Sequence, residues 1–211
     1  MTEQINPAPR AKGRPSLQEA SEIDQAIRDA AVAVLLEYGE AATLNAVAHA
    51  AGLSRKTVYA RYPGKQELFI AAIRDMMAGA RGVTIATTGS AEDRLHDYIR
   101  TALDVISQPQ SRAFQRLLAV NPALIAVLKD EMLAATIRLF FVPLHGLLVE
   151  ADRCGELTVR DADAAARVLI KVIFAEGMRP DDHPGATMTA AERADYARSL
   201  TTLFSRGLLP R

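Results

Sequence analysis

The sequence predicts an all-α protein. Convincing runs of alternating apolar and polar residues, which are typical of strands, are missing, whereas apolar residues recur at steps of three and four. Alanine, the strongest helix former, occurs nearly everywhere, and glycine and proline gather between the periodic segments. Apolar residues make up 49% of the 211 residues, which is enough to bury a sizeable core. We therefore expect about nine helices and no sheet.

Helical periodicity or a helix-start signal marks each expected helix in turn. The expected helices cover residues 23–38, 43–50, 54–61, 65–80, 90–107, 111–120, 122–154, 161–174 and 189–207. In the first part of the chain, Thr43 and Ser54 can cap two short helices that a tight turn at Gly52 separates. The Tyr-Pro-Gly turn at residues 62–64 then ends the second short helix, and a Gly- and Thr-rich loop at residues 81–90 follows the next one.

Helix-start signals are also clear in the second part of the chain. They are Ser90 with Asp93, Asn121 before a proline, Asp161, and Thr189 with Glu192. Side chains of these types accept hydrogen bonds from the free N–H groups of a first helical turn. Pro143 lies inside the longest expected helix, where it must kink or break that helix because it lacks an N–H donor.

The charges balance overall but are unevenly placed. The chain has 25 basic and 25 acidic residues, yet seven of the eight basic residues before position 66 fall in residues 10–14 and 55–65. Such local blocks of positive charge suit a nucleic-acid partner. The single cysteine excludes an internal disulfide, and we find no secretory signal and no apolar run long enough to span a membrane. We expect a cytoplasmic protein.

The helix expected at residues 54–61 has the pattern of a DNA-reading helix. At 100° per residue, Val58 points inward, Lys56 and Ala60 point outward, and Arg55 and Arg61 flank the helix. A helix in the major groove needs such an apolar anchor, an outward face for base edges, and flanking cations for phosphates. The alternative interpretation is a solvated basic face on an ordinary three-helix unit.

The segment AVAHAAGLSRKTVYARYPGKQELF resembles the helix-turn-helix of the TetR/AcrR family of one-component bacterial transcriptional regulators. The resemblance covers about residues 23–69 and implies a flexible basic arm at residues 1–20. It also implies a helix-turn-helix DNA-binding domain at residues 21–66, followed by an effector-binding and dimerisation domain at residues 67–211. A double-stranded DNA operator and a small-molecule effector are the implied partners.

The resemblance also implies which residues touch DNA. Base contacts fall on Arg55, Lys56, Thr57, Tyr59 and Ala60. Backbone contacts fall on Thr43, Ser54, Arg61, Tyr62 and Lys65, and the minor-groove contacts of the arm fall on Lys12 and Arg14. The sequence departs from the family pattern at Ala42, Ala46, the Arg61-Tyr62 pair and Gly64. These departures make the operator sequence harder to infer without removing DNA binding.

Candidate residues for an effector pocket and a dimer interface lie in the second domain. The pocket candidates are Phe114, Leu118, Met132, Phe140, His145 and Phe174. The interface candidates are Ala162, Ala165, Ala166, Leu169, Ile173, Tyr196, Leu200, Leu203 and Phe204. Residues of both kinds also occur in ordinary cores. We expect a homodimer, because one short recognition helix reads too few base pairs and two-fold pairing doubles the site.

The sequence offers no catalytic constellation. The four histidines (His49, His96, His145 and His183) are scattered, and Cys154 has no partner at a metal-binding spacing. We therefore expect no enzyme activity, no metal and no cofactor. The predicted function is a homodimeric repressor that an effector releases from DNA. The alternatives are an effector-independent DNA binder or activator and, from another class, a helical enzyme or carrier that retains the fold.

Overall fold

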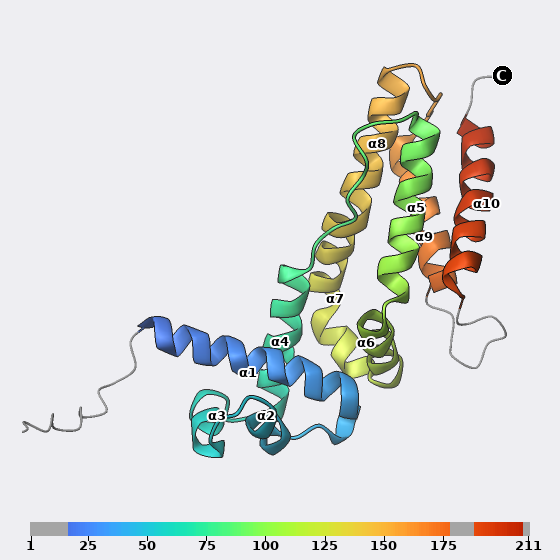
Figure 1. Ribbon diagram of the computed structural model, residues 1–211. Helices are drawn as coiled ribbons and strands as arrows, with labels where there is room; N and C mark the ends of the chain where they lie inside the picture. The colour runs from blue at the N-terminus through green and yellow to red at the C-terminus, as the bar shows by residue number, and fades with distance from the viewer. Residues whose placement is uncertain (1–16, 178–187, 209–211) are drawn as a thin grey trace, which may run out of the picture.

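The structure, a computed structural model, describes residues 17–177 and 188–208, and these ranges are helical apart from turns and loops (Figure 1). The helices are α1 (Leu17–Tyr38), α2 (Leu44–Ala50), α3 (Arg55–Arg61), α4 (Lys65–Gly79), α5 (Ala91–Ser107), α6 (Pro109–Val120), α7 (Pro122–Thr136), α8 (Val142–Arg153), α9 (Ala162–Gly177) and α10 (Ala190–Leu208). A 3-10 turn, η1 (Gly39–Ala41), follows α1, and a π-helical turn, η2 (Ile137–Phe141), joins α7 to α8. Because α7, η2 and α8 form one continuous rod, the described residues form the nine helices of the predicted all-α fold.

The predicted helix starts form their caps in the structure. The side chains of Thr43, Ser54 and Asn121 accept hydrogen bonds from the backbone N–H three residues later, each at 3.1 Å. The Ser90–Asp93 pair forms a complete capping box. At the last helix, the N–H of Thr189 donates to Glu192 at 2.7 Å and the N–H of Glu192 donates to Thr189 at 3.2 Å. Local sequence therefore determines where these helices begin.

Two apolar clusters hold the helices together. The lower cluster joins α1, α2, α3 and α4, and it includes Leu117 of α6 and Leu128 of α7. The upper cluster joins α5, α8, α9 and α10 around side chains such as Leu95 and Tyr98, both fully buried. Helix α4 lies in the lower cluster along most of its length and rises toward the upper bundle (Figure 1). The domain boundary expected at residue 66 therefore falls inside a continuous helix.

Pro143 does not break the long helix. The rod passes it through the π-helical turn η2, in which the N–H of Val142 donates to the carbonyl of Ile137. Two carbonyls of this turn accept hydrogen bonds from other parts of the chain. Leu139 accepts from the N–H of Val83 at 2.9 Å, and Phe140 accepts from the hydroxyl of Tyr98 at 2.9 Å. The expected interruption is thus a widened turn with tertiary partners.

The turn η2 also holds the end of α4. The Arg138 guanidinium donates to the carbonyl of Met77 at 2.7 Å and to that of Ala80 at 2.9 Å. A cation is favourable there because the last carbonyls of a helix lack intrahelical donors and carry partial negative charge. Next to this contact, a Cβ on Gly82 would lie 3.1 Å from the carbonyl oxygen of Leu139, so glycine permits the close approach. We call these contacts between η2 and residues 77–83 the η2 junction.

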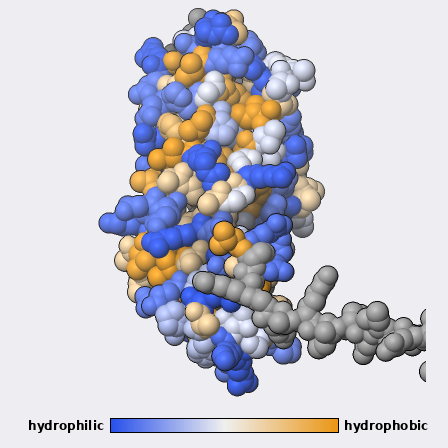
Figure 2. Space-filling model, turned by 90° about the vertical axis from the view of Figure 1, so that its left-hand side faces the viewer, coloured by the Kyte–Doolittle hydropathy of each residue, from blue (hydrophilic) through white to orange (hydrophobic). Residues whose placement is uncertain are grey.

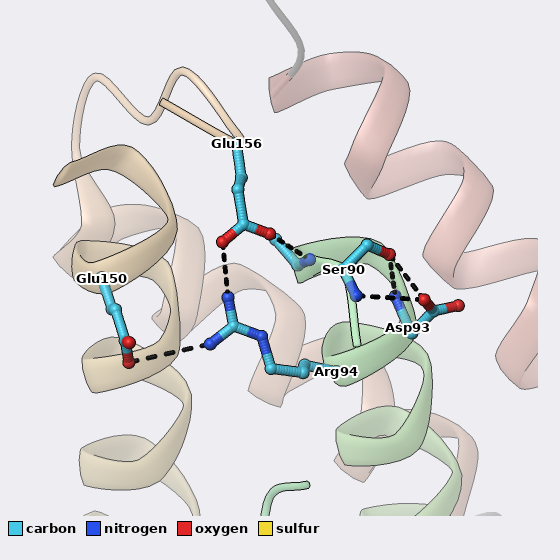
Figure 3. Close-up of polar contacts among 6 residues, drawn as sticks. Ser90, Asp93, Arg94, Glu150 and Glu156 are labelled. Atoms are coloured by element: carbon cyan, nitrogen blue, oxygen red, sulfur yellow. Dashed lines mark hydrogen bonds and ion pairs between the residues drawn. The ribbon is translucent and has the colours of Figure 1, made fainter. Parts of the chain in front are cut away.

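The opposite end of the upper bundle is fastened by a buried arginine (Figure 3). Arg94 of α5 is 8% exposed, and its Nη2 lies 2.9 Å from Glu156 Oε1 in the loop after α8. Glu156 also accepts a hydrogen bond from the N–H of Ala91 at 2.6 Å, and Glu150 of α8 lies 3.7 Å from Arg94 Nη1. The start of α5 is therefore tied to the end of α8.

The expectation that no apolar run is long enough to span a membrane is wrong, because the rod Pro122–Arg153 has the length and the composition to do so. A core helix passes the same test, and this rod packs along α4, α5 and α9. Its other face leaves apolar side chains open to solvent, among them Leu133 (60% exposed), Val142 (58%) and Val149 (45%). Figure 2 shows apolar residues scattered among polar ones on the side of the molecule that it presents.

The Arg94 contacts predict a measurable loss of stability. Arg94→Ala leaves two carboxylates without their cation, so we expect the free energy of unfolding to fall by about 2 kcal/mol in urea denaturation followed by circular dichroism. The control is Arg100→Ala on the same helix, whose ion pairs with Asp97 and Asp104 are exposed. That change should cost no more than about 0.5 kcal/mol. Equal losses in both variants would contradict the role given to Arg94.

Candidate nucleic-acid interface

A tight turn fixes α3 against α2. Gly52 has a φ of +65°, a left-handed conformation that glycine adopts without strain. The N–H of Gly52 donates to the carbonyl of His49 at 3.1 Å, and the N–H of Leu53 donates to Ala48 at 2.9 Å. These bonds satisfy carbonyls at the end of α2 and set the direction in which the chain enters α3. The result is a helix-turn-helix.

The sides of α3 follow the helical geometry expected from the sequence. Val58 is fully buried in the lower cluster, while Lys56 and Ala60 are exposed. Tyr59 is 47% exposed, on the same side of the helix as Lys56 and Ala60. One side of α3 therefore anchors the helix and the other is open to a ligand as large as a DNA duplex.

The exposed cations of α3 are available to phosphates. Among the described residues, neither Arg55 nor Lys56 forms an ion pair. At the start of the same helix, the hydroxyls of Ser54 and Thr57 lie 2.8 Å apart, and Thr57 is partly buried. This end of α3 thus combines positive charge with hydroxyl groups, the side-chain types that contact phosphates and base edges.

The other end of α3 is held by contacts within the protein. Arg61 Nε forms an ion pair with Asp24 Oδ1 of α1 at 2.8 Å. The hydroxyl of Tyr62 accepts a hydrogen bond from Arg28 of α1 at 3.4 Å, and Arg28 also pairs with Asp75 of α4. The hydrogen bond to Tyr62 is the main reason why the pKa of Arg28 is raised. Two residues predicted to contact the DNA backbone thus also fasten α3 to α1.

The first turn of α4 is already partly occupied. Lys65 Nζ donates to the backbone carbonyl of Glu40 and lies 5.9 Å from the centroid of the Phe69 ring. A Cβ on Gly64 would clash with Oε2 of Glu67, so the Glu67 carboxylate lies folded back over the start of the helix. A helix start attracts anions, and here a carboxylate of the same helix occupies that position.

The start of α2 offers less to DNA than α3 does. Thr43 is exposed, but its hydroxyl caps α2 by accepting from the N–H of Ala46. Ala42 is 1% exposed, so this departure from the family pattern puts a methyl group in the core. The predicted arm with Lys12 and Arg14 lies outside the described residues.

The predicted effector-pocket residues lie in two separate places. Phe140 and Phe174 meet edge to face in the upper cluster, with ring centroids 5.0 Å apart, and His145 stacks on Phe141 nearby. The other candidates are Phe114 and Met132, which pack against the lower cluster, and the buried Leu118. The structure does not gather these six residues around one cavity.

The predicted interface residues are divided as well. Four of them, Ala166, Leu169, Ile173 and Leu200, are at most 5% exposed and belong to the core of the protomer. Leu203 of α10 is 68% exposed. Val168 of α9, which is not among the predicted interface residues, is 53% exposed. Helical spacing reveals such a residue only when the inward side of its helix is known.

Two family models match this chain, one for each part of it. Residues 27–72 match the bacterial regulatory proteins of the tetR family. Residues 93–207, more than half of the chain, match the C-terminal domain of AefR-like transcriptional repressors. The HTH-type transcriptional regulator SrpR of Pseudomonas putida is 28% identical over 184 residues, which are 84% of this chain and 85% of SrpR.

Solved structures have the same fold. A TetR transcriptional regulator from Agrobacterium tumefaciens is 24% identical with a TM-score of 0.69, over 89% of this chain and 94% of that chain. The flavonoid-responsive regulator FrrA is 25% identical with a TM-score of 0.57, over 90% of this chain and 99% of FrrA. Both likenesses span the helix-turn-helix and the bundle together.

Substitutions on the exposed side of α3 should reduce the affinity for a specific DNA sequence. We expect Lys56→Ala or Tyr59→Ala to weaken binding to a selected DNA site by about 1–3 kcal/mol, because each removes a side chain that we predict to contact base edges. Fluorescence anisotropy with the selected site and a scrambled duplex measures this loss. Lys129→Ala on α7, which removes an exposed cation outside the helix-turn-helix, is the control. Unchanged affinity in both α3 variants would contradict the prediction that α3 enters the major groove.

Substitution of Lys65 should affect DNA affinity in a different way. We expect Lys65→Ala to weaken binding to selected and scrambled DNA alike, since phosphate contacts carry no sequence information. The slope of log affinity against log salt should fall in magnitude by about 1, as one fewer counterion is released. A selective loss on the selected site alone would indicate that Lys65 contacts a base.

Proposed function

The chain belongs to the TetR family of bacterial DNA-binding transcriptional regulators, and from this premise we propose that it is a homodimeric repressor released from its operator by a small-molecule effector. The observation that carries the proposal is the exposed side of α3, where Tyr59 is open to solvent and Arg55 and Lys56 form no ion pair with the described residues. We place the protein in the cytoplasm, where its DNA target is.

Two copies are needed to read an operator. Helix α3 has seven residues and is about 10 Å long, so it reaches only a few base pairs of one major groove. A two-fold dimer doubles the site and gives a palindromic operator. The exposed Val168 and Leu203 lie on the two helices that carry the predicted interface, α9 and α10. An apolar contact through these helices supports a stable pair.

The η2 junction gives an effector a route to α3. Arg138 and Leu139 hold the end of α4 and the residues after it, and the rest of α4 packs on α1 in the lower cluster. A shift of the rod therefore moves α4 and, with it, the helix-turn-helix. An effector acts this way only if it binds the DNA-incompetent arrangement more tightly. The name of FrrA, a flavonoid-responsive regulator, supports a small molecule as the signal.

Selection of DNA from a random pool tests the function. The purified protein should enrich a palindrome with half-sites about one helical turn or more apart. A reporter carrying that site upstream of a promoter then gives the sign of regulation, since an activator would raise expression. Gel shifts with a metabolite panel test release. Failure to enrich any sequence at low salt would overturn the proposal and favour the helical enzyme or carrier.

The η2 junction predicts a local effect on α4. We expect Arg138→Ala to speed amide hydrogen exchange in residues 77–83 and to lower the free energy of unfolding by about 1–2 kcal/mol, because the carbonyls of Met77 and Ala80 lose a charged donor. Arg74→Ala is the matched control: it removes an exposed ion pair between α4 and Glu131 of α7. Equal exchange rates in the two variants would contradict the junction.

The dimer predicts a definite mass. Sedimentation equilibrium at micromolar concentration should give about twice the 22.8 kDa of the chain. Leu203→Arg should shift the equilibrium toward the monomer, because it places a charge in an apolar contact. The exposed Val149→Arg on α8 serves as a control for the added charge. A monomeric mass for the unaltered protein would contradict the proposed homodimer.

A further inference from the structure

A pocket of about 400 Å³ lies between the DNA-binding helices and the C-terminal bundle. Its walls come from the end of α1, η1 and the start of α4 on one side and from the α6–α7 elbow on the other, which lies above the end of α1 in Figure 1. We propose that this junction pocket binds a small amphipathic anion, and that Lys65 at its rim is shared between this ligand and the DNA backbone. The shared role of Lys65 rests on the proposed DNA-binding function.

The walls of the junction pocket are mainly apolar. They include Leu35, Phe69, Leu117, Leu124 and Val127. Three of these side chains are 4–5% exposed and belong to the lower cluster, whereas Val127 is 42% exposed at the mouth. A pocket of this size and lining takes a small molecule with an apolar body, because burial of its apolar surface drives binding.

The rim supplies one positive charge directed at this pocket. Lys65 is folded so that its ammonium reaches the Glu40 carbonyl and lies 5.9 Å from the centroid of the Phe69 ring, a wall of the pocket. An ammonium has three N–H donors, and the bond to Glu40 uses one of them. An anionic group at the mouth can accept another. Glu40 lines the same rim, so its carboxylate opposes an anion and provides a test of charge sign.

Charge distinguishes the junction pocket from a neighbouring one. A second pocket, of about 500 Å³, lies against α1 and α4 and is lined by Asp29 and Asp75. Its polar wall and its carboxylates disfavour both an apolar body and an anion. We therefore expect an amphipathic anion to bind in the junction pocket and not in this second pocket.

Occupation of the junction pocket would affect DNA binding in two ways. The ligand would engage the Lys65 ammonium that we assign to a DNA phosphate. It would also bridge α4 and the α6–α7 elbow, and so hold the helix-turn-helix in one position relative to the bundle. Because linkage is reciprocal, operator DNA should weaken ligand binding by the same factor as ligand weakens DNA binding.

Isothermal titration of the full chain with three probes tests the pocket. Decanoate should bind, whereas decanol should bind at least about tenfold more weakly and decyltrimethylammonium should not bind, because only decanoate offers the ammonium a charged acceptor. All probes are used below their micelle-forming concentrations. Stronger binding of decanol or of the cationic probe than of decanoate would overturn the proposal.

Single substitutions test whether decanoate binds in the junction pocket. Lys65→Gln should weaken decanoate about tenfold or more, Val127→Glu should remove binding, and Glu40→Gln should strengthen it. Lys129→Gln, an exposed cation on α7 that does not line the pocket, is the matched control and should change nothing. Decanoate binding that survives both Lys65→Gln and Val127→Glu would place the ligand elsewhere and overturn the proposal.

Anisotropy with the selected DNA separates the two proposals. Decanoate should lower the DNA affinity of the unaltered protein and leave that of Val127→Glu unchanged, since Val127 lies away from α3. A protein that binds DNA but not decanoate would overturn the junction pocket alone. A protein that binds decanoate through Lys65 and Val127 but binds no DNA would overturn the proposed function and leave the pocket in place.

Discussion

Pro143 has no N–H to donate, and the arrangement of α4, α5 and the rod depends on two carbonyls of the turn before it, those of Leu139 and Phe140. A buried carbonyl without a donor is costly, so such groups are nearly always paired. Here Leu139 accepts from Val83, after α4, and Phe140 accepts from Tyr98 of α5. Burial of the Tyr98 hydroxyl raises its pKa, which keeps it protonated as a donor. These two bonds join α5 and the segment after α4 to the rod at one place.

The sequence predicts the local parts of this protein well. The caps at Ser54, Ser90 and Thr189 act over three residues, so both partners are visible in one short segment. Which side chains of α3 point inward and which point outward follows from Val58, its buried aliphatic residue, together with helical geometry. The contacts that orient α3 on α1 could not be predicted in this way, because Arg61 and Asp24 are far apart in sequence.

The pocket and the interface show why the rest could not be predicted. An apolar residue at helical spacing looks the same in sequence whether it faces a core, a cavity or another protein. The structure divides the predicted interface accordingly: Leu169 and Ile173 are core residues, whereas Leu203 is exposed. The junction pocket escapes notice for a related reason. Its walls come from distant segments, such as Phe69 and Leu117, that meet only in the folded chain.

The Glu67 carboxylate lies against Gly64, next to Lys65 at the start of α4. An anion that approaches Lys65, whether a DNA phosphate or a ligand of the junction pocket, therefore meets the negative charge of a side chain three residues from Gly64. A free phosphate ion has no other contact to offset this repulsion, whereas a duplex would also contact α3 and an amphipathic anion would also bury its apolar body. We therefore expect the start of α4 to bind only those anions that other parts of the protein also hold.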